Sequence, residues 1–214
     1  GKPLALYCVY SLHYVGGIPA NALSADYFGE FADQMRERLV GDDKTAPFTA
    51  MLANGTSGDI NNVDVRNRTS PSKPLEQMRL VAGRLADVAE KEFRTMKFHE
   101  RATLQASETE LDLKVRKPSA NDVRQAQETL ASSDGKPANV VRDVYAGETL
   151  VLADWPDEVR LKLQTLRIGE LAMAAIPCEA FVEIGLEIKR RSPHHPTFVV
   201  GLANAQFRAH MIYF

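Results

Sequence analysis

The segment 161–204 constrains the fold of this chain most strongly. It contains an apolar strand candidate, a sharp turn, a second strand that ends in Ile176-Pro177-Cys178-Glu179, a helix candidate that ends at Arg191, and a third strand over Thr197–Ala203. The second strand carries leucine, methionine and isoleucine among small alanines, a composition typical of a strand covered on both faces. Strand, helix and strand in this order predict an α/β fold: a single domain with a mixed β-sheet covered by helices.

Glu179 follows this strand directly, where the next helix is expected to begin. Open α/β sheets place ligands at the carboxyl ends of their strands, so Glu179 is a candidate site residue. The alternative is that Glu179 is an acid in the first turn of the helix, where the helix dipole favours negative charge.

The composition limits the classes of protein that this chain can represent. Its 214 residues are 44% apolar and 25% charged, enough for one good core. The net charge of −2 and the pI near 6.3 argue against a nucleic-acid-binding protein, which would carry an excess of basic residues. The sequence contains no run of 18 apolar residues, so it predicts no transmembrane helix. Cys8 and Cys178 stand in apolar strand contexts and are expected to be small buried side chains rather than a disulfide or metal pair.

Two more predicted strands end in polar residues. The apolar run Leu4–Leu12 ends at His13, before a Gly-Gly turn, and the run Phe48–Ala53 leads into loop 54–62, which has two glycines and four Asp or Asn residues. Such a loop is either an Asx-rich surface turn or a site loop brought to the same edge of the sheet as His13. A histidine at a strand end can ligate a metal or simply bond to a carbonyl group.

Helical patterns fill much of the remaining chain. Apolar stripes over Leu23–Val40, with Ser24 as a candidate cap, and Pro74–Met96 predict two core helices. A capping signal at Ser119 starts a third helix, and a fourth is expected over Ala138–Leu152 with an interruption near Gly147. We expect one domain over residues 1–214, in which residues 117–155 form an outer helical subregion with too few large apolar residues for a core of its own.

The order of these motifs resembles the neutral/alkaline, non-lysosomal ceramidase family. The similar segments are Ser11-Leu12-His13, Gly58-Asp59-Ile60-Asn61-Asn62, Leu166–Glu170 with Ile176–Glu179, and Phe198–Asn204. The resemblance spans most of this chain and covers the later part of that family's catalytic domain. In the family, a zinc ion held by two histidines, a glutamate and a tyrosine activates water that hydrolyses the amide bond of ceramide.

The resemblance implies roles for four residues. His13 matches the second histidine ligand of the zinc ion, and Glu179 matches the glutamate ligand, in a Pro-Cys-Glu sequence where the family has Pro-Gly-Glu. Asp59 and Asn61 would line the catalytic pocket and orient or polarise the acyl group. The implied substrate is an N-acyl sphingoid lipid or a related N-acyl compound. The implied location is outside the cell, which two sequons at Asn54 and Asn67 allow.

This chain also departs from the family pattern. Asn61 stands where the family has a catalytic serine, and no tyrosine follows Asn204 in register, since Tyr213 comes too late and His210 lies in an unmatched tail. The first histidine ligand would precede Gly1. His13 and Glu179 therefore fill two of four zinc positions, whereas zinc sites use three or four protein ligands, so this chain should hold zinc weakly.

Two functions follow as hypotheses. The first is a ceramidase-like, zinc-dependent amide hydrolase, of which this chain is an incomplete part that is inactive alone. The second is a catalytically degenerate relative that binds a lipid, a glycan or a protein. Self-association is expected if apolar sheet surface is exposed, and a monomer at high concentration in a sizing experiment would contradict this expectation.

Overall fold

The computed structural model describes residues 3–41, 43, 45–64, 66, 73–132 and 141–204. The order of the described elements confirms the predicted α/β fold. They are β1 (Ala5–Tyr10), α1 (Asp26–Val40), β2 (Thr49–Asn54), α2 (Glu76–Thr95), β3 (Leu104–Lys114), α3 (Ala120–Ala131), α4 (Val141–Asp154), β4 (Glu158–Ile168), β5 (Leu171–Ala175), α5 (Val182–Arg191) and β6 (Thr197–Val200).

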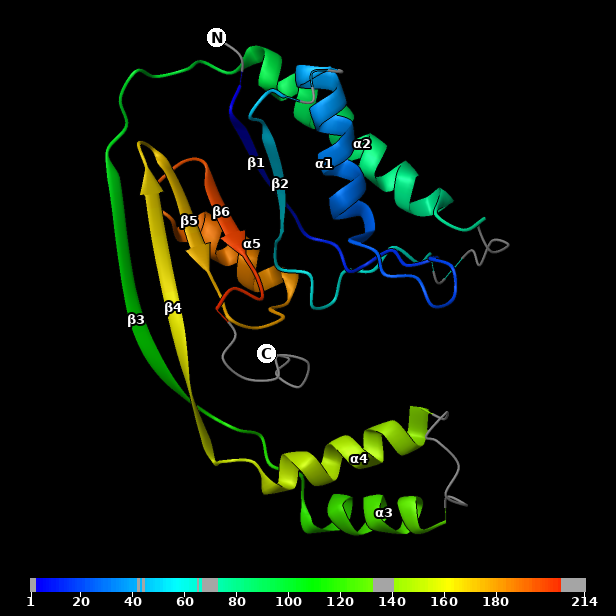
Figure 1. Cartoon of the computed structure of the whole chain (residues 1–214). Coiled ribbons are helices and arrows are strands. Elements are labelled where there is room, and N and C mark those ends of the chain that lie inside the picture. Colours follow the sequence, from blue (N-terminus) through cyan, green and yellow to red (C-terminus); the bar gives the residue numbers. More distant parts are fainter. Residues whose placement is uncertain are drawn as a thin grey trace.

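The strands form two sheets that lie side by side (Figure 1). β1 and β2 make a parallel pair, and the larger, mixed sheet has the order β3-β4-β5-β6, in which only β5 and β6 are parallel. β1 lies near β6, where the rings of Tyr7 and Phe198 are 6.3 Å apart. Because β1, β2, β5 and β6 run in the same direction, their carboxyl ends meet at one edge of the molecule (Figure 1).

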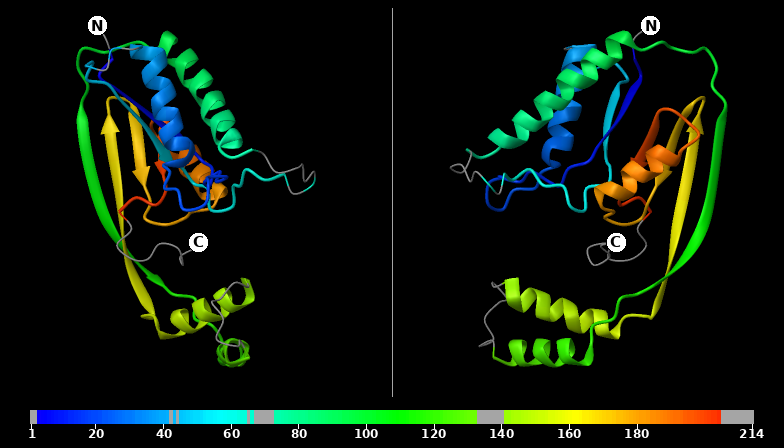
Figure 2. Two further views of the ribbon diagram at one scale, coloured as in Figure 1. Left: turned by 45° about the vertical axis from the view of Figure 1, so that its right-hand side comes forward. Right: turned by 180° about the vertical axis from the view of Figure 1, so that it is seen from behind.

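The main core lies between the two-stranded sheet and two helices. α1 contributes Tyr27, Phe31 and Met35, which are 0%, 1% and 0% exposed and are spaced four residues apart on one helix face. α2 packs on the other side of α1 through small side chains, including Ala82 and Ala86 (Figure 2). The apolar stripes in the sequence therefore identify the core correctly.

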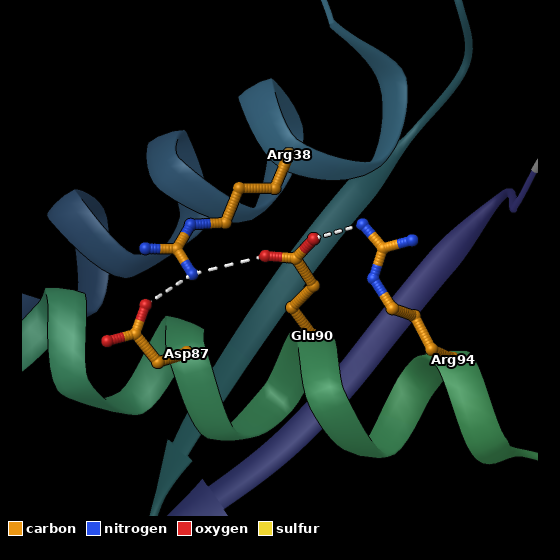
Figure 3. A network of polar contacts seen from close by, with 4 residues as sticks. All are labelled: Arg38, Asp87, Glu90 and Arg94. Carbon is orange, nitrogen blue, oxygen red and sulfur yellow. Dashed lines mark hydrogen bonds and ion pairs between the residues drawn. The ribbon is translucent and has the colours of Figure 1, made fainter.

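An ion-pair network joins the exposed sides of α1 and α2 (Figure 3). Arg38 on α1 donates to Asp87 at 2.7 Å and to Glu90 at 3.3 Å, and Glu90 also pairs with Arg94. Hydrogen bonds from Arg94, with the positive charges of both arginines, hold the pKa of Glu90 below its usual value. Exposed pairs contribute little to stability one by one, so the network adds only modestly to the packing of α2 against α1.

The long β3–β4 ribbon carries the α3–α4 hairpin away from the rest of the molecule (Figures 1 and 2). The predicted cap is confirmed, because the hydroxyl of Ser119 accepts from the amide of Asp122 while the Asp122 carboxylate accepts from the amide of Ser119.

The prediction that the fourth helix is interrupted near Gly147 is wrong. α4 continues through Gly147, since one glycine inside a helix costs only about 1 kcal/mol relative to alanine.

The larger sheet is less covered than its composition suggests. All five residues of β5 are half-buried, and β3 is exposed along nearly its whole length, because α5 covers only part of one face. Leu104, Leu166 and Ile168 are exposed on the other face. They are apolar surface of the kind on which the self-association prediction depends.

Among the described helices, none is long and apolar enough to cross a membrane.

Candidate functional site

Backbone hydrogen bonds draw the ends of β1, β2 and β6 together. The amide of Gly55 donates to the carbonyl of Tyr10 at 2.9 Å, and the amide of Gly201 donates to the carbonyl of Asn54 at 3.0 Å. Leu202 in turn donates to the carbonyl of Cys178, beside Glu179, at 3.1 Å. Loop 54–62 is therefore built into the same edge of the molecule as the segment that contains Glu179.

Two glycines make this close contact sterically feasible. A Cβ atom on Gly58 would lie 2.6 Å from the carbonyl oxygen of Glu179, and a Cβ atom on Gly201 would lie 2.6 Å from the carbonyl oxygen of Gly55. Both distances are shorter than a carbon and an oxygen tolerate. Loop 54–62 can approach Glu179 and the end of β6 only because these positions carry no side chain.

His13 lies on the other flank of the same loop. It is half-buried, and its amide donates to the carbonyl of Ile60 at 3.2 Å. The fully buried Tyr27 donates its hydroxyl to the carbonyl of Leu12 at 2.8 Å and so fixes the residue before His13. Burial, with the negative charge of Asp26, raises the pKa of Tyr27, which keeps this hydroxyl a donor at all ordinary pH values.

Asp26 fixes the turn that follows His13. Its carboxylate is buried and accepts hydrogen bonds from the amides of Val15 at 3.0 Å, Gly16 at 2.8 Å and Tyr27 at 2.7 Å. Asp26 has a φ of 54°, a left-handed conformation that costs energy in a non-glycine residue. This strained carboxylate at the start of α1 organises the His13 turn. The prediction of Ser24 as the cap of this helix is wrong, because the N-cap residue is Ala25. The hydroxyl of Ser24 accepts from the amide of Asp26, whose own role was not predicted.

Glu179 lies outside helix α5. The helix starts three residues later at Val182, and Glu183 is the acid in its first turn. The alternative that Glu179 is a first-turn acid is therefore wrong. Glu179 is half-buried between the buried residues Cys178 and Ala180, and Ala180 accepts a hydrogen bond from the amide of Gly58 at 3.0 Å.

Polar side chains of loop 54–62 already have partners within the protein, among them Asp59, Asn61 and Ser57. Asp59 accepts from the amide of Val182 at 2.9 Å and caps α5. Asn61 is exposed, and its side-chain oxygen accepts from the amide of Val63 at 3.3 Å, which leaves its amide NH₂ group as a donor for other acceptors. Ser57, the only serine in the loop, is buried, and its hydroxyl accepts from Asn54 at 2.8 Å. That bond also occupies the side-chain amide of the Asn54 sequon.

Both cysteines are free thiols in the structure. Cys178 is buried as expected, whereas Cys8 is only half-buried. Burial raises the pKa of both thiols, so they stay protonated at neutral pH. A protonated thiol is a poor metal ligand and a poor nucleophile, so Cys178 contributes packing beside Glu179 rather than chemistry.

The structure thus brings His13 and Glu179 to two flanks of one loop. Within the described residues, no group of three or more His, Cys, Asp and Glu side chains is placed to hold a metal ion. His210 and Tyr213, the other candidates considered, lie outside the described residues. The residues present do not by themselves fit a zinc ion, because zinc sites use at least three protein ligands.

The fold and the site define an α/β protein with polar loops gathered at the carboxyl ends of its parallel strands, the usual position of a ligand site in such folds. No protein-family model matches the chain, and no curated protein matches it significantly. Solved structures do. The chain is similar to a neutral ceramidase from Pseudomonas aeruginosa, with a TM-score of 0.58 and 15% identity over 92% of this chain and 36% of that chain. It is also similar to a ceramidase complexed with C2, with a TM-score of 0.56 and 15% identity over 92% of this chain and 38% of that one.

At 15% identity these likenesses establish a shared fold. The chain spans little more than a third of the length of these ceramidases. The resemblance noted in the sequence is therefore confirmed at the level of the fold, over little more than a third of each of these ceramidases.

Proposed function

We propose that this chain is part of a ceramidase-like hydrolase that cleaves the amide bond of an N-acyl sphingoid lipid or a related N-acyl compound. The observation that carries the proposal is the meeting of three segments at one edge of the fold: the His13 turn, loop 54–62 and the segment before α5. The ceramidase fold of the neighbours supports it. The substrate, action outside the cell and the absence of nucleic-acid partners belong to the same proposal.

The roles of the residues follow from their positions. His13 and Glu179 offer a nitrogen and a carboxylate, the ligand types that zinc prefers. A zinc ion, where bound, would supply an activated water, and it would need further ligands from residues beyond those described. The amide NH₂ group of Asn61 can donate to the substrate carbonyl, because its side-chain oxygen is the atom bonded to Val63. Asp59 positions loop 54–62 against α5.

The test is fatty-acid release by the natural protein that contains this chain, loaded with zinc, from N-acyl sphingosines of several acyl lengths. Loss of a residue that only supports a metal ligand typically lowers activity about 10- to 100-fold. Glu179→Gln changes a proposed ligand itself, so it should lower kcat/KM by at least this factor. Glu183→Gln, in the exposed first turn of α5, is the matched control and should change little. No release from any N-acyl lipid would refute the proposal.

A second candidate, a degenerate relative that binds without turnover, has support from the loop. Ser57 is buried and bonded, and Asn61 occupies the position of the family serine, so loop 54–62 offers no exposed serine. Asn61→Ser distinguishes the two functions. Turnover that appears only in this variant would favour the degenerate relative. Turnover by the unaltered protein, unchanged in the variant, would remove this candidate.

A further inference from the structure

A cavity of about 710 Å³ lies toward the amino-terminal ends of β5 and β6, whereas the candidate site lies at their carboxyl ends. Its walls are the middle of the larger sheet, the carboxyl-terminal end of α5 and the turn 192–194. The right-hand view of Figure 2 shows α5 in front of β6, with β4 and β3 to the right of the helix. Cavities of this volume are typical of sites for small organic molecules.

The strand register places one polar row of side chains on this cavity. Gln105 pairs with Arg167, Arg167 pairs with Ala172, and Ala172 pairs with Thr197, so all four side chains share a face of the sheet. The next row on the same face begins with Ser107 and Thr165 and continues to Ala174. A polar sheet face beside a helix is unusual unless it binds something, because such faces normally carry the core.

The charges in this lining are all of one kind. Arg167 and Arg191 are the charged residues that line the cavity, and among the described residues no acidic side chain lines it. The guanidinium of Arg167 bonds only neutral oxygens in the described part of the chain, the carbonyl of Gly169 at 2.7 Å and the side-chain oxygen of Gln105 at 3.3 Å. An arginine without a carboxylate partner, inside a cavity, favours an anion.

Arg191 adds to this positive charge. Its partner is Glu187 at 2.5 Å, but the same carboxylate also binds Arg190, at 2.7 Å through each of two nitrogens. One carboxylate therefore faces two guanidinium groups, and the end of α5 keeps an excess positive charge. Ile188 and the small side chains of Ala172 and Ala174 supply an apolar surface next to these cations.

The turn that closes the cavity is internally bonded. The hydroxyl of Thr197 donates to the carbonyl of His194 at 2.7 Å, and the hydroxyl of Ser192 accepts from the amide of His194 at 3.2 Å. These bonds hold the turn 192–194 against the start of β6 without an added ligand. The cavity is therefore formed in advance, which lowers the cost of binding.

We propose that this cavity binds a small organic anion, a carboxylate or a phosphate monoester with a short apolar chain, and that Arg167 is its charge partner. The anionic head lies between Arg167 and Arg191 and receives hydrogen bonds from the neighbouring hydroxyls. The apolar chain lies along Ile188 and the alanines of β5. This site is separate from the candidate hydrolase site and does not depend on the proposed function.

The test is calorimetric titration of the 214-residue chain with octanoate, octyl phosphate, octanamide and inorganic phosphate. The first two probes distinguish a carboxylate from a phosphate ligand, and at least one should bind more tightly than neutral octanamide and than inorganic phosphate. Arg167→Gln should weaken that binding at least about tenfold, the usual effect of losing a charged hydrogen bond. Arg84→Gln, the same change on the exposed surface of α2, should leave it unchanged.

Ser107→Glu provides an independent variant, because β3 is exposed and tolerates the change while the new carboxylate faces the cavity. It should abolish binding without lowering the melting temperature. The proposal would be overturned if octanamide bound as tightly as the anionic probes. It would also be overturned if inorganic phosphate bound as tightly or more tightly, because the cavity would then hold an adventitious ion only. Unchanged affinity in Arg167→Gln or Ser107→Glu would overturn it as well.

Discussion

The carboxylate of Asp59 accepts a hydrogen bond at 2.9 Å from the amide of Val182, which lies 123 residues further along the chain. Val182 is the first residue of α5, and its amide has no acceptor within the helix. Asp59 therefore caps α5 from a distant loop, and its negative charge suits the helix dipole. This bond links loop 54–62, which contacts the His13 turn, to the segment that contains Glu179.

Removing this cap should destabilise the protein. Asp59→Ala leaves the Val182 amide without its acceptor and should lower the free energy of unfolding by about 1 kcal/mol, the usual cost of losing a capping side chain. Asp59→Asn keeps an oxygen acceptor and should lose less. Urea denaturation measures both, with Asp33→Ala on the exposed side of α1 as control. Equal stability of Asp59→Ala and the control would contradict the capping role.

Gly58 should tolerate no side chain. In Gly58→Ala the new Cβ atom would lie 2.6 Å from the carbonyl oxygen of Glu179 and 2.8 Å from the Phe181 ring, so we expect a loss of about 1–3 kcal/mol from overpacking. Gly147→Ala is the matched variant, because its Cβ atom meets nothing within 4 Å inside α4. It should gain about 0.5–1 kcal/mol through helix propensity. Stability changes of the same sign in both variants would show that the close contact at Gly58 is not real.

Asp26 should control the conformation of the His13 turn. Asp26→Ala removes the acceptor of three amides and should cost about 2 kcal/mol or more. Asp26→Asn replaces one acceptor oxygen by an NH₂ group, so one of its hydrogen bonds should be lost. Hydrogen exchange at Val15 and Gly16 should accelerate in both variants, while amides in α2 change only as global stability does. Unchanged exchange at these two amides would refute the role of Asp26.

Glu187 should remain ionised at pH values where an ordinary glutamate is protonated, down to about pH 2. Hydrogen bonds from Arg190 and Arg191 lower the pKa of Glu187 from 4.5 to about 2. A depressed carboxylate pKa means that the charged form is favoured in the folded helix, so its contribution is present above pH 4.5 and is lost as the pH falls toward 2. Carboxyl-carbon NMR titration measures this directly. In Arg190→Gln/Arg191→Gln the pKa should return toward its ordinary value, and a titration near 4.5 in the unaltered chain would contradict the pairing.

Much of the fold follows from local patterns. The apolar stripe of α1, the capping box at Ser119 and the polar ends of β1 and β2 are short-range signals, and each predicts its element correctly. The extent to which the strands are buried does not follow, because burial depends on which helices cover the sheet. The strand β5 has the composition of a core strand, yet α5 covers only part of one face.

The meeting of the candidate site residues at one edge of the fold follows from the sequence, whereas their hydrogen-bond partners do not. His13, loop 54–62 and Glu179 each follow a predicted strand, and the parallel strands bring them to one edge. The roles of Asp26 and Asp59 were not predictable from local patterns. Asp59 binds an amide 123 residues away, and Asp26 binds amides of the preceding turn from a left-handed backbone conformation. The cavity at Arg167 was also missed, because its residues come from four strands and a helix end and share no local motif.

The central claim is that His13 and Glu179 act in one hydrolytic site. A double-mutant cycle on fatty-acid release by the natural zinc-loaded protein tests it most directly. If both side chains serve one centre, His13→Ala, Glu179→Ala and the double variant should each lower kcat/KM by nearly the same factor. If the two losses multiply in the double variant, or if either single variant keeps full activity, the two residues do not share a site.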